Sequence, residues 1–191
     1  MLRSGWTAII VAVMALLAVA CQPSEKIAAP PSDPRLDAMF ADLKAASDAF
    51  TAEQAEQKIW AQWGSSGSPT VDILMERALN AEAAKENDLA QTYLTEATKL
   101  APNYAEAWNR RAVIAFAAED YDSTLKFIHE TLKREPRHFG ALAGLGVLYE
   151  QMGQNRAALA AYQEALAIHP FMEAAKQGVA RLSPKLDGQD T

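Results

Sequence analysis

Three prolines at equal spacing constrain the fold of this chain more than any other feature. Pro102, Pro136 and Pro170 are 34 residues apart, and the chain around them aligns without a gap. A fixed period of this length indicates tandem units that stack on one another, because one such unit cannot bury its apolar face alone. The units are residues 71–104, 105–138 and 139–172.

Each unit predicts two helices joined by a short polar turn. The turns are KEND, EDYD and GQNR. The proline of each unit lies near the end of the second helix, because proline cannot continue a helix. Half of the residues are hydrophobic and few are aromatic, which is typical of one alanine-rich helical domain.

The third unit resembles the tetratricopeptide repeat (TPR). The matching residues are Leu142, Leu145, Gly146, Tyr149, Ala158, Tyr162, Ala165 and Pro170, and Trp108 occupies the aromatic opening position of the second unit. The three positions where this family needs small residues hold Ala78, Ala90 and Ala97, then Ala112, Thr124 and Thr131, then Gly146, Ala158 and Ala165. The resemblance implies an all-α fold, a right-handed TPR solenoid of antiparallel helix hairpins.

Glycines are concentrated in the first helix of the third unit. A dinucleotide-binding loop would need glycine where Tyr149 follows Gly146, so that interpretation fails on spacing. Gly140 and Gly144 have the spacing of a membrane-helix contact, but polar residues from Glu150 onwards end the apolar run too early. We therefore predict that Gly146 lets the two helices of its unit pack closely.

Segments outside the three units predict further helices. Residues 35–63 indicate a degenerate hairpin, whose second helix has a plausible start at Thr51 followed by Glu53. After the break GSSGSP, Ser68 is a candidate cap and Pro69 a first helical residue. Residues 173–183 predict a capping helix with a polar outer face, and residues 184–191 a disordered tail.

The first twenty residues have the pattern of a secretory signal peptide. Arg3 precedes an apolar run that is too short to span a bilayer comfortably, and small residues precede Cys21. LAVAC resembles the lipobox of bacterial lipoproteins, although Ala18 stands where leucine is usual. We expect lipidation of Cys21; the alternative is ordinary cleavage after Ala20, which leaves an unmodified thiol. Acyl chains would anchor the protein in a membrane.

The expected location is the bacterial cell envelope. Residues 21–34 hold four prolines and predict an extended tether. By resemblance, Gln22 after the cysteine suggests the outer membrane, with the domain facing the periplasm. The net charge of the whole chain is −6, and removal of residues 1–20 takes away one base and no acid. An acidic chain of this kind argues against nucleic acid as a partner.

The polar residues give no pattern for catalysis, a metal or a cofactor. His129, His138 and His169 lack the spacing of a zinc pair, and no Ser/His/Asp arrangement can be assembled. Arg77 and Arg111 occupy a position that the family usually keeps apolar. We expect their stems to pack between helices with the guanidinium groups reaching carboxylates; an anion site is the alternative.

The resemblance implies a peptide or a helix bound in the concave groove formed by the first helices. The lining would comprise Glu76, Leu79, Glu106, Asn109, Arg110, Val113, Phe116, Ala143, Gly144 and Val147, with Asp72, Met75, Glu82, Gly140 and Glu150 beside them. Only Arg110 is basic among the positions at which chaperone-binding members clamp a carboxylate, so that clamp is absent.

We therefore expect a non-enzymatic adaptor of the cell envelope that binds one or more envelope proteins. A lipoprotein that binds a small ligand is the alternative, and it requires a closed pocket rather than an open groove. Enzyme activity ranks third.

Overall fold

The computed structural model describes residues 33–187, which form nine helices and, in that range, no strand. Their bounds are α1 Pro34–Ala45, α2 Ala49–Trp63, α3 Pro69–Ala83, α4 Asn87–Leu100, α5 Ala105–Ala117, α6 Tyr121–Arg134, α7 Phe139–Gln151, α8 Asn155–Ile168 and α9 Glu173–Asp187. The predicted signal peptide, Cys21 and nearly all of the tether lie outside the described residues.

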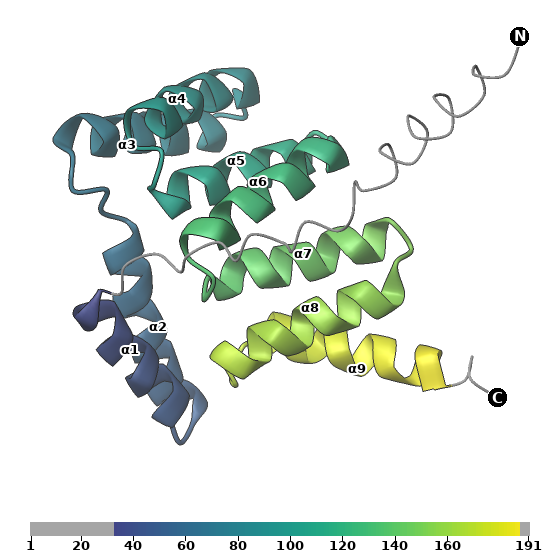
Figure 1. Cartoon of the computed structure of the whole chain (residues 1–191). Coiled ribbons are helices and arrows are strands. Elements are labelled where there is room, and N and C mark those ends of the chain that lie inside the picture. The colour runs from purple at the N-terminus through teal and green to yellow at the C-terminus, as the bar shows by residue number, and fades with distance from the viewer. Residues whose placement is uncertain (1–32, 188–191) are drawn as a thin grey trace, which may run out of the picture.

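Three helix hairpins, α3–α4, α5–α6 and α7–α8, are stacked in chain order (Figure 1). The second helix of each hairpin packs on the first helix of the next, α4 on α5 and α6 on α7, and α9 then covers α8. Each unit buries its small residues: Ala90 in the first, Thr131 in the second and Ala165 in the third are each 0% exposed. The predicted all-α solenoid is confirmed.

The same turn is built three times within the repeats. Lys85, Glu119 and Gly153 are 34 residues apart, and all three have a positive φ, between 58° and 71°. Only Gly153 adopts this conformation without a steric penalty, which for other residues is roughly 1 kcal/mol or more. The turn is closed each time by a main-chain hydrogen bond, such as that from Gln154 N to Tyr149 O at 2.8 Å. The repeat therefore fixes backbone geometry even where the residue type is unfavourable.

Gly146 is a packing glycine, as predicted. A Cβ atom at this position would lie 2.5 Å from Cε1 of Tyr162 on α8, which is closer than real Cβ contacts occur. A Cβ atom at Gly178 on α9 would lie just as close to the opposite edge of the same ring. Tyr162 is 1% exposed, so its ring fills the space between α7 and α9. Its burial, followed by its hydrogen bond to Glu150, raises the pKa of the phenol to about 12.

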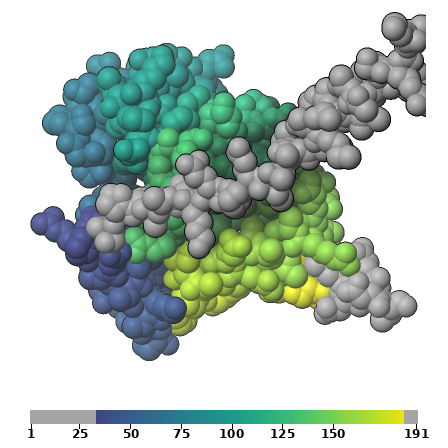
Figure 2. Space-filling model, in the orientation of Figure 1, coloured from purple at the N-terminus to yellow at the C-terminus, as the bar shows by residue number. Residues whose placement is uncertain are grey.

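The N-terminal hairpin α1–α2 is placed against the third repeat. Its apolar core, which includes Ile59 and Trp63, is continuous with Phe139 at the start of α7 and with Ile168, Phe171 and Met172 near the end of α8. Figure 2 shows this hairpin in purple and blue against the yellow and lime C-terminal helices, and Figure 1 shows α3–α4 at the other end of the stack. Polar contacts hold the same interface: Arg137 pairs with Asp37 at 2.6 Å, and Glu56 contacts His169 at 3.0 Å.

Two helix ends differ from the sequence-based prediction. The second helix of the hairpin begins after Asp48 rather than at Thr51, because Asp48 and Thr51 cap each other reciprocally. The last helix continues through Pro184 to Asp187, so the predicted end at residue 183 is wrong. Ser68 and Pro69 hold the predicted cap and first positions of α3, although Ser66, not Ser68, bonds Asp72.

Candidate functional site: an apolar groove on the first helices

One aliphatic residue projects from the first helix of every repeat. Leu79, Val113 and Val147 occupy the same repeat position, and they are 42%, 45% and 39% exposed. Aliphatic side chains at core positions of these repeats are buried, as Leu94 and Leu148 are. A row of exposed aliphatic residues across the first helices of three successive repeats is therefore a candidate contact surface.

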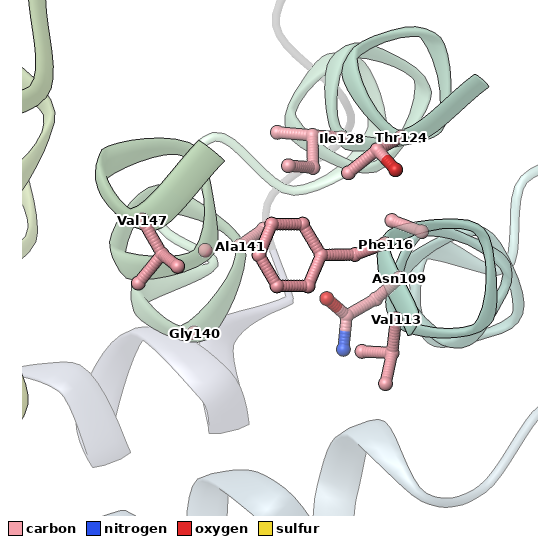
Figure 3. Close-up of a pocket in the computed structure, with 10 residues that line it drawn as sticks. Asn109, Val113, Phe116, Thr124, Ile128, Gly140, Ala141 and Val147 are labelled. Atoms are coloured by element: carbon pink, nitrogen blue, oxygen red, sulfur yellow. The ribbon is translucent and has the colours of Figure 1, made fainter. Parts of the chain in front are cut away.

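A pocket opens beside this row, between the second and third repeats. It has a volume of about 240 Å³ and lies between α5, α6 and α7 (Figure 3). The lining is Asn109, Ala112, Val113, Phe116, Thr124, Ile128, Gly140, Ala141, Gly144 and Val147. Because a closed cavity of about 150 Å³ accommodates benzene, this one has room for a large apolar side chain.

Two glycines of α7 shape the pocket in different ways. A Cβ atom at Gly144 would meet nothing within 4 Å, so the absence of a side chain there leaves the pocket open. At Gly140, a Cβ atom would lie 2.9 Å from Cη2 of Trp60 on α2. The N-terminal hairpin therefore covers the beginning of α7 and borders the groove at that edge.

An ionic network lies under the N-terminal part of the groove. Arg110 donates to Glu106 at 2.7 Å, and its guanidinium lies 3.9 Å from Glu82 on α3. Glu106 also contacts Nε2 of His138 at 3.2 Å. Burial alone would raise the pKa of Glu106, but the hydrogen bonds from His138 and Arg110 and the positive charge of Arg110 outweigh it and hold the pKa below its ordinary value. Arg110 is thus already bound by carboxylates of its own chain.

His138 connects this network to the N-terminal hairpin. Its Nδ1 accepts a hydrogen bond from the main-chain N–H of Ala141 at 3.1 Å, so the ring proton is on Nε2 and is donated to Glu106. Its ring is fully buried and stacks on Trp63, with 4.2 Å between centroids and 3° between planes. His138 is therefore a structural residue at the junction of two repeats and the hairpin.

The first repeat adds acidic groups to the groove. Asp72 accepts hydrogen bonds from the hydroxyl and the N–H of Ser66, at 2.6 and 2.9 Å, which lower its pKa. Glu76 is exposed and forms no ion pair among the described residues. Glu76 occupies the repeat position that Arg110 has in the second unit and Gly144 in the third. At this repeat position the groove therefore changes from acidic at α3 to uncharged at α7.

The structure brings most of the predicted lining residues together, with two corrections. Asn109, Val113, Phe116, Gly144 and Val147 line the pocket. Leu79 and Glu76 are exposed on α3, and Arg110 bridges α3 and α5. Glu106 and Ala143 are instead 5% and 7% exposed. Met75, expected beside the lining, is also buried, in the core between α3 and α4.

The reasons for the two corrections differ. Glu106 is enclosed by its own ion-pair partners, and Ala143 belongs to the core that α8 and α9 form around Tyr162. Sequence reasoning missed Thr124 and Ile128 of α6, because it assigned the groove to first helices alone.

Arg111 also departs from expectation. Its guanidinium lies 4.1 Å from the Phe127 ring centroid and donates to Gln91 and Thr98, at 3.2 Å in each case, and not to a carboxylate. Burial lowers its pKa. Its role is packing between the first and second repeats, where the cation lies on an aromatic face.

Neither a metal cluster nor a membrane span occurs in the described part of the chain. Between residues 33 and 187, no group of three or more His, Cys, Asp and Glu side chains is placed to hold a metal ion. Over the same range, no helix has the length and apolar character needed to cross a membrane.

Sequence comparison defines the family. Models of the tetratricopeptide repeat match residues 75–123 and 115–182. A TPR repeat-containing protein of Rhizobium etli is 38% identical over 157 residues, which are 82% of this chain and 77% of that protein. The chain belongs to the tetratricopeptide repeat family. Protein bimA of Emericella nidulans is 29% identical over 86 residues, 45% of this chain and 11% of bimA.

Solved structures share the fold at low identity. The Sgt2 TPR domain from Aspergillus fumigatus superimposes with a TM-score of 0.60 at 22% identity and covers 64% of this chain and 83% of that domain. The first TPR of Spaghetti (RPAP3), bound to the HSP90 peptide SRMEEVD, gives 0.60 at 16% identity, with 63% and 95% covered. MamA gives 0.58 at 18% identity, with 82% and 83% covered.

Proposed function

We propose that this protein is a non-enzymatic adaptor that binds a segment of a partner protein in the groove of its first helices. The observation that carries the proposal is the apolar pocket between α5, α6 and α7 beside the exposed row Leu79, Val113 and Val147. An apolar pocket beside a row of exposed aliphatic residues can bury a large apolar side chain of a partner.

The shape of the site supports a chain segment rather than an enclosed small molecule. Val113 and Val147 at the pocket are each more than one third exposed, and the apolar row continues from the pocket to Leu79 on α3. A small-ligand site would bury most of its ligand in a closed cavity. The peptide bound to the related fold of Spaghetti (RPAP3) is a further parallel.

A pocket-filling variant tests this proposal. Gly144→Leu should place a side chain in the open pocket without a clash at Cβ, and it should keep or raise helicity because leucine favours a helix over glycine. Val147→Glu should instead introduce a charge that a partner would have to desolvate, at a cost of about 2 kcal/mol or more. Both variants should lose the envelope partner in affinity capture while their circular dichroism matches wild type.

Lys126→Glu is the matched control, because Lys126 is exposed on α6 and does not line the pocket. Capture should be unchanged in this variant. Retention of the partner by both groove variants, with loss in Lys126→Glu, would assign binding to the outer face.

We further propose that the adaptor acts in the bacterial envelope, attached to the outer membrane through acylated Cys21 and facing the periplasm. The proposal is supported by the signal-like residues 1–20, by the lipobox-like LAVAC and by Gln22. Cys21→Ser should release the protein from membranes and block its lipoprotein processing. Unchanged membrane association in fractionated cells would refute the anchor while leaving the groove proposal intact.

A further inference from the structure

The charges around the apolar groove specify the kind of segment that it accepts. Three acids, Asp72, Glu76 and Glu82, occupy groove positions of α3, and Arg110 on α5 is the one base at the groove positions. Glu106 is buried against Arg110, and Glu150 on α7 pairs with Arg181. Arg110 lies 2.7 Å from Glu106 and 3.9 Å from Glu82, so its charge is compensated within the chain. The free charge that a partner meets beside Leu79 is therefore negative.

Glu76 is the acid best placed to meet a partner. It lies one helical turn from Leu79 on α3, and it is exposed, with no ion pair among the described residues. Asp72, one turn further back, has a pKa lowered by Ser66 and is ionised at neutral pH. Arg110 of α5 reaches Glu82 of α3, which shows that this side of α3 borders the same groove.

We propose, on the basis of the function proposed above, that the groove selects a basic amphipathic segment. An apolar side chain of that segment fills the pocket between α5 and α7, and lysine or arginine beyond it lies over α3 beside Glu76. Because the pocket borders α5 and Glu76 lies on the neighbouring first helix α3, one partner segment can contact both. The HSP90 peptide SRMEEVD has more acids than bases, which is the opposite charge pattern.

Designed peptides test the charge preference before the partner itself is identified. One fluorescent peptide carries central leucines flanked by lysines, and a second has every lysine replaced by glutamate. The lysine peptide should bind at least about tenfold more tightly at low salt, and the difference should shrink as salt rises because Glu76 is exposed to solvent.

Three variants separate the two proposals. Glu76→Lys should remove most of the preference for the lysine peptide, whereas Glu164→Lys, an equal charge change at an exposed position of α8, should leave it unchanged. Gly144→Leu carries no charge and should weaken both peptides, because it fills the pocket.

The possible results are distinct. In one outcome, Gly144→Leu weakens binding, but the two peptides bind equally or Glu76→Lys has no effect. This result would overturn the basic-segment inference and leave the groove function in place. Binding that is unaffected by Gly144→Leu, or no binding of either peptide, would overturn both.

Discussion

The two ends of the repeat stack are finished differently. At the C-terminal end, α9 covers α8, and the Tyr162 ring is enclosed between Gly146 and Gly178. At the N-terminal end, Ile73 on α3 is 50% exposed, although Ala107 and Ala141 at the same repeat position are 0% and 1% exposed. Among the described helices, α3 packs extensively only against α4. A side chain at a given repeat position is therefore buried only where a neighbouring unit packs against it.

The hairpin that precedes α3 in the chain does not supply the missing cover. Its aromatic residues pack on His138, the N-cap of α7, and on Phe139, the first residue of α7. The ring centroids of Trp60 and Trp63 lie within 5.5 Å of those of both residues. The hairpin thereby borders the groove at α7 while the far face of α3 stays open. Substitutions in these regions test this difference.

Trp63→Ala should have the largest effect. The side chain is 7% exposed between Phe40, Phe139 and His138, and truncation of a buried aromatic costs about 3–5 kcal/mol. Hydrogen exchange should show α1 and α2 losing protection first. Phe50→Ala in the same hairpin is the control; at 68% exposure it should change stability by less than about 0.5 kcal/mol. Equal effects would mean that the hairpin is not docked.

Gly146→Leu should destabilise the C-terminal end by at least about 1–3 kcal/mol, because the new side chain overlaps Tyr162. Urea unfolding measures the change. Gly144→Ala, two residues earlier on α7, faces open space and should instead gain up to about 1 kcal/mol from helix propensity. A Gly146 variant with wild-type stability would show that α7 and α8 are not in close contact.

Glu106→Gln should have a smaller, pH-dependent effect at the junction beneath the hairpin. The pKa of Glu106 is lowered in the folded state, so its charge contributes stability above the ordinary value of 4.5, and this is lost as pH falls through the folded value. The free energy of unfolding of the variant should be lower by roughly 1 kcal/mol at neutral pH. It should also fall less steeply than that of wild type as the pH is lowered. The free energy of unfolding is measured at several pH values. If it falls with decreasing pH equally in the variant and in wild type, the assigned network is contradicted.

Ile73→Lys should have the smallest effect, within about 0.5 kcal/mol, because the exposed end of α3 can solvate a lysine. Ala141→Lys at the same repeat position buries an unpaired charge and should be severely destabilising. Comparison of the two melting curves gives the test. A large loss in Ile73→Lys would reveal that something covers α3 in solution.

The repeat core was predictable from sequence because its signals are local and periodic. The proline spacing predicted three hairpins, and the position of Gly146 in the third unit predicted close helix packing. The exposed valines of the groove follow from the same period, which places them on one face of each first helix. Residues 34 apart share an environment wherever a neighbouring unit is present.

The position of the hairpin could not be predicted in this way. Trp60 and Trp63 are apolar enough to form a core, but no period relates them to Phe139, which is far away in the chain. Burial of Glu106 likewise depends on His138, 32 residues later at the N-cap of α7, and on the hairpin that covers it. Such contacts depend on distant segments that lack a shared pattern.

Site-specific photo-crosslinking can identify the surface of the protein that the partner contacts. A photoreactive amino acid is placed at Val147 in the groove and, separately, at Lys126 on the outer face, and the crosslinked partner peptide is identified by mass spectrometry. We expect crosslinks from position 147 to a segment that carries an apolar residue with lysine or arginine nearby, and none from position 126. Crosslinks from position 126 alone would contradict binding in the groove.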